Sequence, residues 1–521
     1  MAKIVIDPIT RIEGHLSIEI DVQNGKVVDA WSIGDMYRGF ERIFVGRNPL
    51  DSTQLSQRIC GVCPISHGIA SSKCLEDAFG IKPNRNGRIL RNLMKGANFL
   101  HSNLIHFYHL AALDYVDITA LLKYNGGDSK INNLKEWAKN EFSVKKNRND
   151  AITAAAPFLP RYEGNFYLKD VDANIDAIAG YVKALEIRMK AHKMVAAVGG
   201  RIPHAISLVA GGVTQMPNRT MIKEYKKYLR EVEKFINETY MGHVVAVAKA
   251  FKDYFKIGTF TNFLSYGLFN LDSEEKKFLT QRGVVYGTKV EAFDPGKITE
   301  QVRFARYNSG SNLPPLRGQT QEQIGKPGAY TWSKAPRYAG KPMEVGALAR
   351  VVVSYLSDNK LVKSEVDTLL KIFNADISAV FSVLGRHAAR AIESKLIAAH
   401  LWEWIDELDV NGKPRNYFDI PDNSEGMGLV EAARGALGHW IVIKDKKIAN
   451  YQAIVPTAWF CGPRGDDGVK GPVEQALIGT PISDPKNPIE AARVVRSFDP
   501  CLACAVHVVE GDRDIGTFRV C

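Results

Sequence analysis

Two Cys-x-x-Cys pairs near opposite ends of this 521-residue chain constrain its fold more than any other feature. The first pair is Cys60 and Cys63, and the second is Cys501 and Cys504. Two intervening residues let both sulfurs of a pair face one metal ion, so two such pairs supply four thiolates. If the four sulfurs share one site, the two ends of the chain must meet. The sequence therefore favours one cooperative domain over several separate ones.

The other cysteines and the composition narrow the class of protein. Seven cysteines are an odd number, and a large chain does not need disulfide cross-links, so reduced thiols for metal or redox chemistry are favoured. Cys74 and Cys461 stand outside the pairs, and we expect them to be small buried apolar residues. With 45% hydrophobic and 24% charged residues, the chain has the composition of a folded globular protein, which argues against disorder.

The charge pattern and the first residues argue against nucleic-acid binding, a signal peptide and a membrane-spanning helix. The net charge is +11, but basic residues alternate with acidic ones, as in residues 224–227, and this is typical of solvated helix faces. Asp7, Arg11 and Glu13 interrupt the apolar core that a signal peptide needs. No stretch reaches the ~20 apolar residues of a membrane helix. We therefore expect no nucleic-acid partner, no leader and no membrane span in this chain.

The spacing of apolar residues predicts an α+β fold, mainly α, in which a bundle of long helices carries small antiparallel sheets. Polar and apolar residues alternate over residues 3–33 with Asn24-Gly25 as the expected turn, and a second hairpin is expected within residues 438–455. Helical spacing extends over four long segments: residues 86–117, 175–198, 219–254 and 361–407.

The residues beside the cysteines do not determine which metal the site would bind. Arg58 and His67 accompany the first pair, and Asp499 and His507 accompany the second. A structural zinc clamp would not need these polar groups, although a single histidine is more often a core or surface residue than a functional one. Four sulfur ligands suit zinc and iron-sulfur chemistry equally well, so spacing alone keeps a four-cysteine zinc structural site as an alternative.

The segments around the cysteines resemble the paired signature of the large subunit of nickel-iron hydrogenases. The resemblance extends over essentially the whole chain and includes further segments in the order of that family: residues 7–15 (DPITRIEGH), 38–41 (RGFE), 106–110 (HFYHL), 434–440 (RGALGHW) and 451–457 (YQAIVPT). It implies an oxidoreductase that cleaves H2 reversibly and heterolytically, in the direction of H2 uptake. It also implies the hydrogenase large-subunit fold.

The resemblance assigns the four cysteines to a nickel-iron centre. Cys60 and Cys501 would be terminal ligands of nickel, and Cys63 and Cys504 would bridge nickel to an iron that carries carbon monoxide and cyanide. Soft thiolates suit both metals. By the same resemblance, His67 would donate to a bridging sulfur and Thr457 to a cyanide.

Three further residues would handle charge and protons near the metals. The preferred proton acceptor is the Cys501 thiolate, Glu13 would relay the proton outward as a buried carboxyl, and Arg434 would position the reactants or act as a transient base. Asp499 would be a carboxylate above the metals, where relatives often have another Asp in place of Ser102. Without the resemblance, Glu13 would be an exposed hairpin glutamate, Arg434 an ion-pair or capping arginine and Asp499 a turn residue.

A magnesium ion and a cleaved tail complete the implied centre. Glu41, His507 and the backbone carbonyl of Ala453 would bind Mg²⁺ with waters, and a change of side chain at Ala453 would be harmless. Residues 1–507 would form a single catalytic domain. Residues 508–521 would be a maturation peptide that a dedicated protease removes after His507 once nickel is bound.

The implied chemistry releases electrons that this chain has no further cysteine cluster to carry. The expected partner is an iron-sulfur small subunit in a heterodimer, bound across a broad apolar face of the long helices, with a membrane cytochrome b reached through that subunit. Export with the small subunit to the periplasmic side of the cell membrane is expected, with a cytoplasmic location as the alternative.

Two other functions remain alternatives to the enzyme. One is a non-catalytic scaffold related to the subunit that shapes a quinone site in a respiratory complex, although that subunit lacks the cysteine pairs. The other is a hydrogen sensor of the same family, which would tend to lack the cleavable tail.

Overall fold

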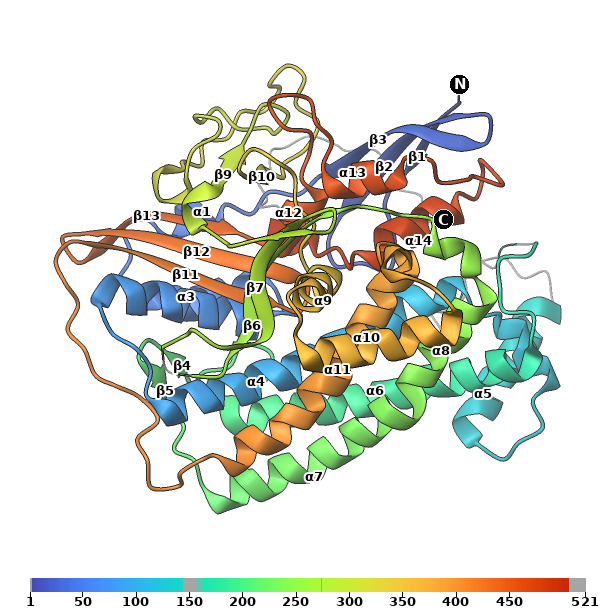
Figure 1. Ribbon diagram of the computed structural model, residues 1–521, viewed down its shortest axis with the longest axis horizontal. Helices are drawn as coiled ribbons and strands as arrows, with labels where there is room; N and C mark the ends of the chain where they lie inside the picture. The colour runs from blue at the N-terminus through green and yellow to red at the C-terminus, as the bar shows by residue number, and fades with distance from the viewer. Residues whose placement is uncertain (1, 144–157, 159–161, 163, 273, 506–521) are drawn as a thin grey trace.

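The computed structural model describes residues 2–143, 158, 162, 164–272 and 274–505. It is an α+β structure dominated by long helices, as the apolar spacing predicts (Figure 1). Each small sheet is antiparallel. No described helix combines the length and apolar composition that crossing a membrane would need. His507 and the proposed maturation peptide lie outside the described residues.

The strands form five small sheets. The N-terminal sheet has the order β1-β2-β3, and its β2–β3 hairpin turns at Asn24 and Gly25 with φ values of 50° and 71°, which confirms that turn. The other sheets have the orders β4-β5, β6-β7-β8, β10-β9 and β11-β12-β13. The strands are β1 (Ala2–Ile6), β2 (Leu16–Gln23), β3 (Lys26–Gly34), β4 (Leu208–Val209), β5 (Gly212–Val213), β6 (Asn262–Asn270), β7 (Phe278–Tyr286), β8 (Lys289–Glu291), β9 (Ile298–Gln301), β10 (Ala335–Tyr338), β11 (Ser424–Ala432), β12 (Gly435–Lys444) and β13 (Lys447–Ile454).

The helices comprise a central bundle and shorter pieces packed around it. They are α1 (Phe40–Phe44), α2 (Asp51–Ser56), α3 (Pro64–Phe79), α4 (Arg85–Leu104), α5 (Ser129–Ser143), α6 (Val171–Gly199), α7 (Arg219–Phe235), α8 (Met241–Ala250), α9 (Ala347–Leu356), α10 (Lys360–Phe373), α11 (Val383–Asp406), α12 (Pro456–Cys461), α13 (Pro472–Leu477), α14 (Ile489–Ser497) and α15 (Leu502–Ala505). Helices α4, α6, α7 and α11 pack alongside one another in the bundle (Figure 1).

One predicted helix is wrong as a single element. The pattern over residues 361–407 is divided into α10 and α11, because Asn374 ends α10 in the left-handed conformation (φ 49°) and the Ser382 side chain caps the start of α11. The patterns from residues 86 and 219 likewise begin as α4 and α7 but continue through short π-helical turns. Apolar spacing continues across such breaks, so it does not reveal them.

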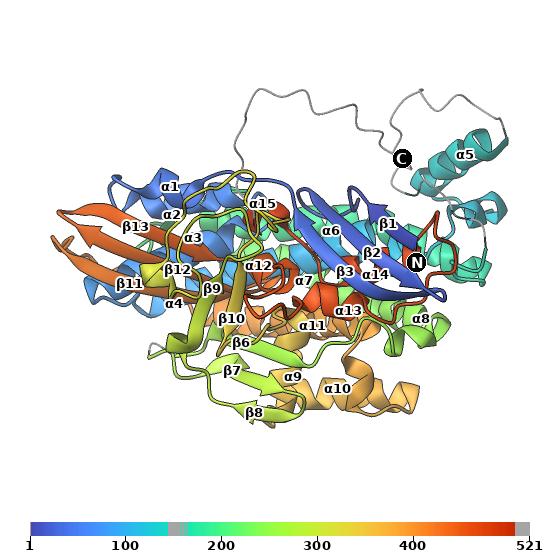
Figure 2. The same cartoon turned by 90° about the horizontal axis from the view of Figure 1, so that it is seen from above.

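The architecture brings the ends of the chain together over the bundle. Figure 2 shows the N-terminal sheet beside the C-terminal helices α13 and α14, and β3 contacts α13 directly. Helix α3, which follows the first cysteine pair, packs closely on β11. A Cβ atom at Gly428 would lie 2.0 Å from the Ala70 carbonyl oxygen, so only glycine permits this approach. The first cysteine pair is thereby held against the sheet that leads toward the second.

Candidate metal centre

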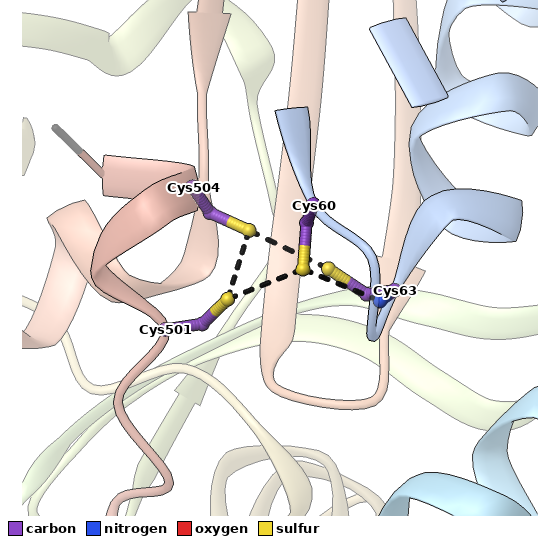
Figure 3. A group of neighbouring side chains, drawn as sticks. All are labelled: Cys60, Cys63, Cys501 and Cys504. Carbon is purple, nitrogen blue, oxygen red and sulfur yellow. Dashed lines mark hydrogen bonds between the residues drawn. The ribbon is translucent and has the colours of Figure 1, made fainter. Parts of the chain in front are cut away.

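The two cysteine pairs meet in one buried cluster, as their spacing predicts. The ligand sulfurs of Cys60, Cys63, Cys501 and Cys504 all lie within 4.8 Å of one another. Figure 3 shows the four sulfur atoms turned toward a common centre. The closest sulfur pairs are Cys501 and Cys504 at 3.1 Å and Cys60 and Cys501 at 3.3 Å, which are contacts between free thiols.

Local backbone contacts fix the position of each pair. The first pair precedes α3, and the amides of Val62 and Cys63 point at the Cys60 sulfur from 3.2 and 3.4 Å. The second pair is bound to the N-terminal segment, because the Glu13 amide donates to the Pro500 carbonyl and the Leu502 amide donates to the Glu13 carbonyl. These bonds hold the Glu13 segment against the second pair.

Gly14 makes this docking sterically feasible. It adopts a φ of 81°, and a Cβ atom there would lie 2.7 Å from the Ala503 nitrogen. A glycine is therefore required directly after Glu13.

The donor set fits soft transition metals. Hydrogen bonds from Cys501, Cys504 and Cys60 lower the pKa of Cys63 well below its ordinary value against the effect of burial, and His67 adds to the lowering. Burial raises the pKa of Cys501 and of Cys504 well above that value. Bound metal ions would stabilise the thiolate form of these cysteines, which nickel, iron and zinc all accept as a ligand.

Glu13 lies at the edge of the cluster. The Cys501 thiol donates to Glu13 Oε2 at 2.9 Å, and the Ala503 amide donates to the same oxygen at 3.1 Å. The side chain is only half-buried, so the expected full burial of this carboxyl is wrong. Glu13 lies in the segment between β1 and β2, where the next residues, Gly14 and His15, are exposed.

Arg434 and Asp499 form a buried ion pair beside the sulfurs. Arg434 occupies the two-residue turn between β11 and β12, and its Nη2 donates to Asp499 Oδ1 at 2.9 Å. Its Nη1 lies 3.4 Å from the Ser102 hydroxyl. Burial acts to lower the pKa of Arg434, but the negative charge of Asp499 and of the cysteines outweighs it and places this pKa well above the ordinary value. Burial raises the pKa of Asp499 against the effect of Arg434.

His67 and Thr457 also contact the centre. His67 Nδ1 lies 3.2 Å from His439 Nε2, while its Nε2 is buried and has no hydrogen-bond partner within the described part of the chain. The Thr457 hydroxyl accepts a hydrogen bond from the Cys501 amide at 2.9 Å, and its own proton remains available for another acceptor.

Glu41 lies in a polar cluster separate from the four cysteines. The Ala453 amide donates to Glu41 Oε1 at 3.1 Å, and Lys334 Nζ lies 3.1 Å from Oε2. Lys334 also bonds to Glu300 and to Gln452. Burial raises the pKa of Glu300 to about 7 against the effect of Lys334. The third expected ligand, His507, lies outside the described residues.

Sequence reasoning missed two residues that organise these sites. The Arg38 guanidinium donates to the carbonyls of Ile59 and Ala503 and so connects the two cysteine segments. Lys334 places its ammonium beside Glu41, and no sequence motif suggests this contact. Arg38 could have been suspected because it shares a short segment with Glu41. Cys74 and Cys461 are buried outside the cluster, as expected.

Comparison with known proteins decides the family. A sequence profile described as nickel-dependent hydrogenase matches residues 38–507, and one described as HoxL-like matches residues 3–32. The chain belongs to the nickel-dependent hydrogenase family. It is 42% identical to the periplasmic [NiFeSe] hydrogenase large subunit of Desulfomicrobium baculatum over 98% of this chain and 96% of that protein. It is 37% identical to the quinone-reactive Ni/Fe-hydrogenase large chain of Wolinella succinogenes, over 99% and 98% of the two chains.

Solved structures agree with the sequence relatives. The reduced, active Ni-Fe-Se hydrogenase of Desulfomicrobium baculatum aligns with a TM-score of 0.85 at 41% identity, over 97% of this chain and 100% of that one. The expected hydrogenase large-subunit fold is therefore confirmed. As a large subunit of this family, the chain is an oxidoreductase acting on H2, and the scaffold and zinc-clamp alternatives are not favoured.

Proposed function

We propose that this chain is the catalytic subunit of a nickel-iron hydrogenase working in H2 uptake, and that the buried cluster of four cysteines carries this function. Cys60 and Cys501 are proposed as terminal nickel ligands, and Cys63 and Cys504 as bridges to an iron with carbon monoxide and cyanide ligands. When bound, the metal pair supplies a redox-active centre for heterolytic cleavage of H2. Support comes from the convergence of four buried sulfurs and from the nickel-dependent family match.

The protein's part in the reaction is to accept and export a proton. We assign acceptance to the Cys501 sulfur, which already lies 2.9 Å from Glu13 Oε2. Because this distance permits direct transfer, the proton can pass to the carboxylate and then to water at the half-buried side of Glu13. The Ala503 amide holds the receiving oxygen in place.

Arg434 serves as a fixed positive charge in this proposal. A guanidinium whose pKa lies above its usual range stays protonated, so it is a poor resting base but a good positioning group. Its ion pair with Asp499 fixes its orientation toward the sulfurs. His67 and Thr457 are proposed to donate hydrogen bonds to a bridging sulfur and to an iron-bound cyanide.

The metal assignment is tested by metal analysis and infrared spectroscopy of the matured heterodimer. We expect one nickel per heterodimer, iron in excess of nickel because the iron-sulfur small subunit carries iron of its own, and the stretching bands of carbon monoxide and cyanide, which no zinc site produces. Zinc in place of nickel, or a spectrum without these bands, would support the four-cysteine zinc site instead.

We further propose a magnesium ion at Glu41. Within a strand, the N–H and C=O groups of one residue point to the same side, so the Ala453 amide that reaches Glu41 brings its carbonyl toward the same space. A carboxylate and a carbonyl oxygen suit Mg²⁺, and His507 would complete the protein ligands. Lys334 beside Glu41 would then contact the waters of the ion.

Replacing Glu41 by glutamine is expected to remove this magnesium and to lower the free energy of unfolding by about 3 kcal/mol, because a buried partner of Lys334 loses its charge while Glu300 remains. Metal content and a denaturation midpoint measure both effects. The matched control is Glu425→Gln, which breaks an exposed pair with Arg317 and should change neither quantity appreciably. Undiminished magnesium in Glu41→Gln would exclude this site.

Partners and location follow from the same proposal. The described residues contain no second cluster of metal-binding side chains, so the electrons need an iron-sulfur small subunit, and we propose a heterodimer with a membrane cytochrome b beyond it. The predicted apolar face of the long helices stays a prediction; exposed large apolar side chains there include Leu185 and Met189 of α6. Exposed Ile43, Val45 and Leu50 in the α1–α2 segment offer a smaller apolar surface for a partner.

We propose a periplasmic location, supported by the name of the Desulfomicrobium baculatum relative, with the cytoplasm as the alternative. Residues 1–507 are proposed as the single catalytic domain. A maturation protease is proposed to remove residues 508–521, and the family match ends at the same residue, 507.

A further inference from the structure

A small cationic cavity lies outside the metal centre, between α3, α4, β6 and β11. Its volume is about 40 Å³, and its polar lining includes Lys73 from α3 and Arg88, Arg91 and Lys95 from α4. The three α4 residues recur at i, i+3 and i+7, which places them on one face of the helix. Glu275 is the one carboxylate in this lining.

Two of the four cations have their own carboxylates. Arg91 makes a two-pronged pair with Glu76 at 2.5 and 3.1 Å. Lys73 Nζ lies 2.7 Å from Glu275, whose other oxygen accepts a hydrogen bond from Asn270. Glu76 and Glu275 are therefore each in contact with one of these two cations, and neither forms an ion pair with Lys95 or Arg88.

Lys95 has no counter-charge in contact with it. The residue is 6% exposed, and among the described residues its ammonium makes no hydrogen bond and no ion pair. The rings of Phe269 and Phe99 lie 5.1 and 5.9 Å from Nζ, and the carboxylates of Glu431 and Glu275 act on the ammonium without forming an ion pair with it. Burial, and next the charge of Lys73, lower the pKa of Lys95 to about 7. A buried cation in this position needs either to lose its proton or to gain an anion.

Arg88 is nearly as poorly neutralised. Its Nε is buried without a hydrogen-bond partner within the described chain, and its Nη1 donates to the Asn270 carbonyl at 3.0 Å. The nearest carboxylate, on the half-exposed Glu407, lies 3.9 Å away. The cavity thus holds one cation, Lys95, with no carboxylate in contact, and a second, Arg88, whose only ion pair is the long one to Glu407 at its outer side.

We propose that this cavity binds a small inorganic anion of the size of chloride between Lys95 and Arg88. A single water needs roughly 10–15 Å³ of such space, so the cavity has room for a monatomic anion, whereas organic ligands occupy pockets of roughly 300 Å³ or more. The rim is accessible, because Glu275 is about 31% exposed in its side chain. The bound anion would connect α3 and α4 to β11, the strand that leads to Arg434.

Crystals of the unmodified enzyme soaked in sodium bromide provide the first test. Anomalous diffraction should give a peak in the cavity, within hydrogen-bonding reach of Lys95 Nζ and the Arg88 guanidinium. Density for water only, with no bromide signal at this position, would overturn the proposal. This test requires no variant and is independent of hydrogenase activity.

Thermal unfolding of the heterodimer provides the second test. Exchanging gluconate, which is too large for the cavity, for chloride at constant ionic strength should raise the unfolding midpoint of the unmodified enzyme by about 1–2 °C. The shift should disappear in Lys95→Met. It should persist in Lys82→Met, which removes an exposed lysine paired with Glu274 at 3.1 Å. Equal chloride responses in both variants would contradict the assignment.

Discussion

Replacing Cys501 by alanine should abolish both H2 turnover and nickel retention. The substitution removes the sulfur that contacts two other cysteines of the cluster and Glu13 at once. We expect H2 uptake to fall by at least about 10³-fold, equivalent to roughly 4 kcal/mol of lost transition-state stabilisation. Dye-linked H2 uptake and the nickel content of the purified heterodimer measure the two effects.

Cys74→Ala is the matched control for this variant. Cys74 is equally buried, but its thiol donates to the Gly426 carbonyl and takes no part in the cluster. Its replacement should lower the free energy of unfolding by roughly 1 kcal/mol, because it removes one buried group about the size of a methyl. Nickel content and H2 turnover should stay unchanged. Full activity in Cys501→Ala would contradict the assignment. Equal loss in both variants would mean that general destabilisation, and not ligand loss, explains the result.

The cluster could be predicted from the sequence because its geometry is largely local. Each Cys-x-x-Cys pair brings its own two sulfurs together within a single turn, so only the meeting of the two pairs depends on the fold. Arg38 joins the two cysteine segments directly, and backbone bonds between Glu13 and residues 500–502 dock the second pair on the N-terminal segment. No periodicity of apolar residues encodes these bonds, and the resemblance to the family anticipated only that the Glu13 carboxyl lies near the Cys501 sulfur.

The helices were predictable in extent but not in their interruptions. Apolar residues recur at helical spacing on both sides of Asn374, so the pattern continues where the backbone reverses into the left-handed conformation. A helix cap depends on the contact of one side chain with a few backbone amides. It therefore leaves a signal at only one or two residues, whereas apolar spacing is read over many. Asn374 and Ser382 were the available signals for the break.

Arg38 and Lys334 show a second limit of sequence reasoning. Both are basic residues whose partners lie far away in the chain, at residue 503 for Arg38 and at residue 41 for Lys334. A basic residue in a sequence is most often a solvated surface group. Nothing in its immediate neighbours reveals that it bonds to a carbonyl or a carboxylate hundreds of residues away.

Glu13→Gln should separate proton export from metal binding. Glutamine has nearly the shape of glutamate and can still accept a hydrogen bond from the Ala503 amide, but it cannot take up a proton at neutral pH. Loss of a positioned acid–base group typically costs about 10²–10⁴-fold in rate. We therefore expect H2 uptake to fall within this range while nickel and iron contents stay unchanged.

Isotope exchange gives the decisive measurement for Glu13. When D2 is supplied in H2O, the unmodified enzyme should release HD and H2 as protons exchange with solvent, and Glu13→Gln should form these products far more slowly. Glu19→Gln is the control, because Glu19 lies on the neighbouring strand β2 in an ion pair with Lys3 near the surface. Exchange at the normal rate in Glu13→Gln would remove this residue from the relay. The Cys501 proton would then have to leave by another path, since Glu13 is the only carboxylate that the described chain places in hydrogen-bond contact with that sulfur.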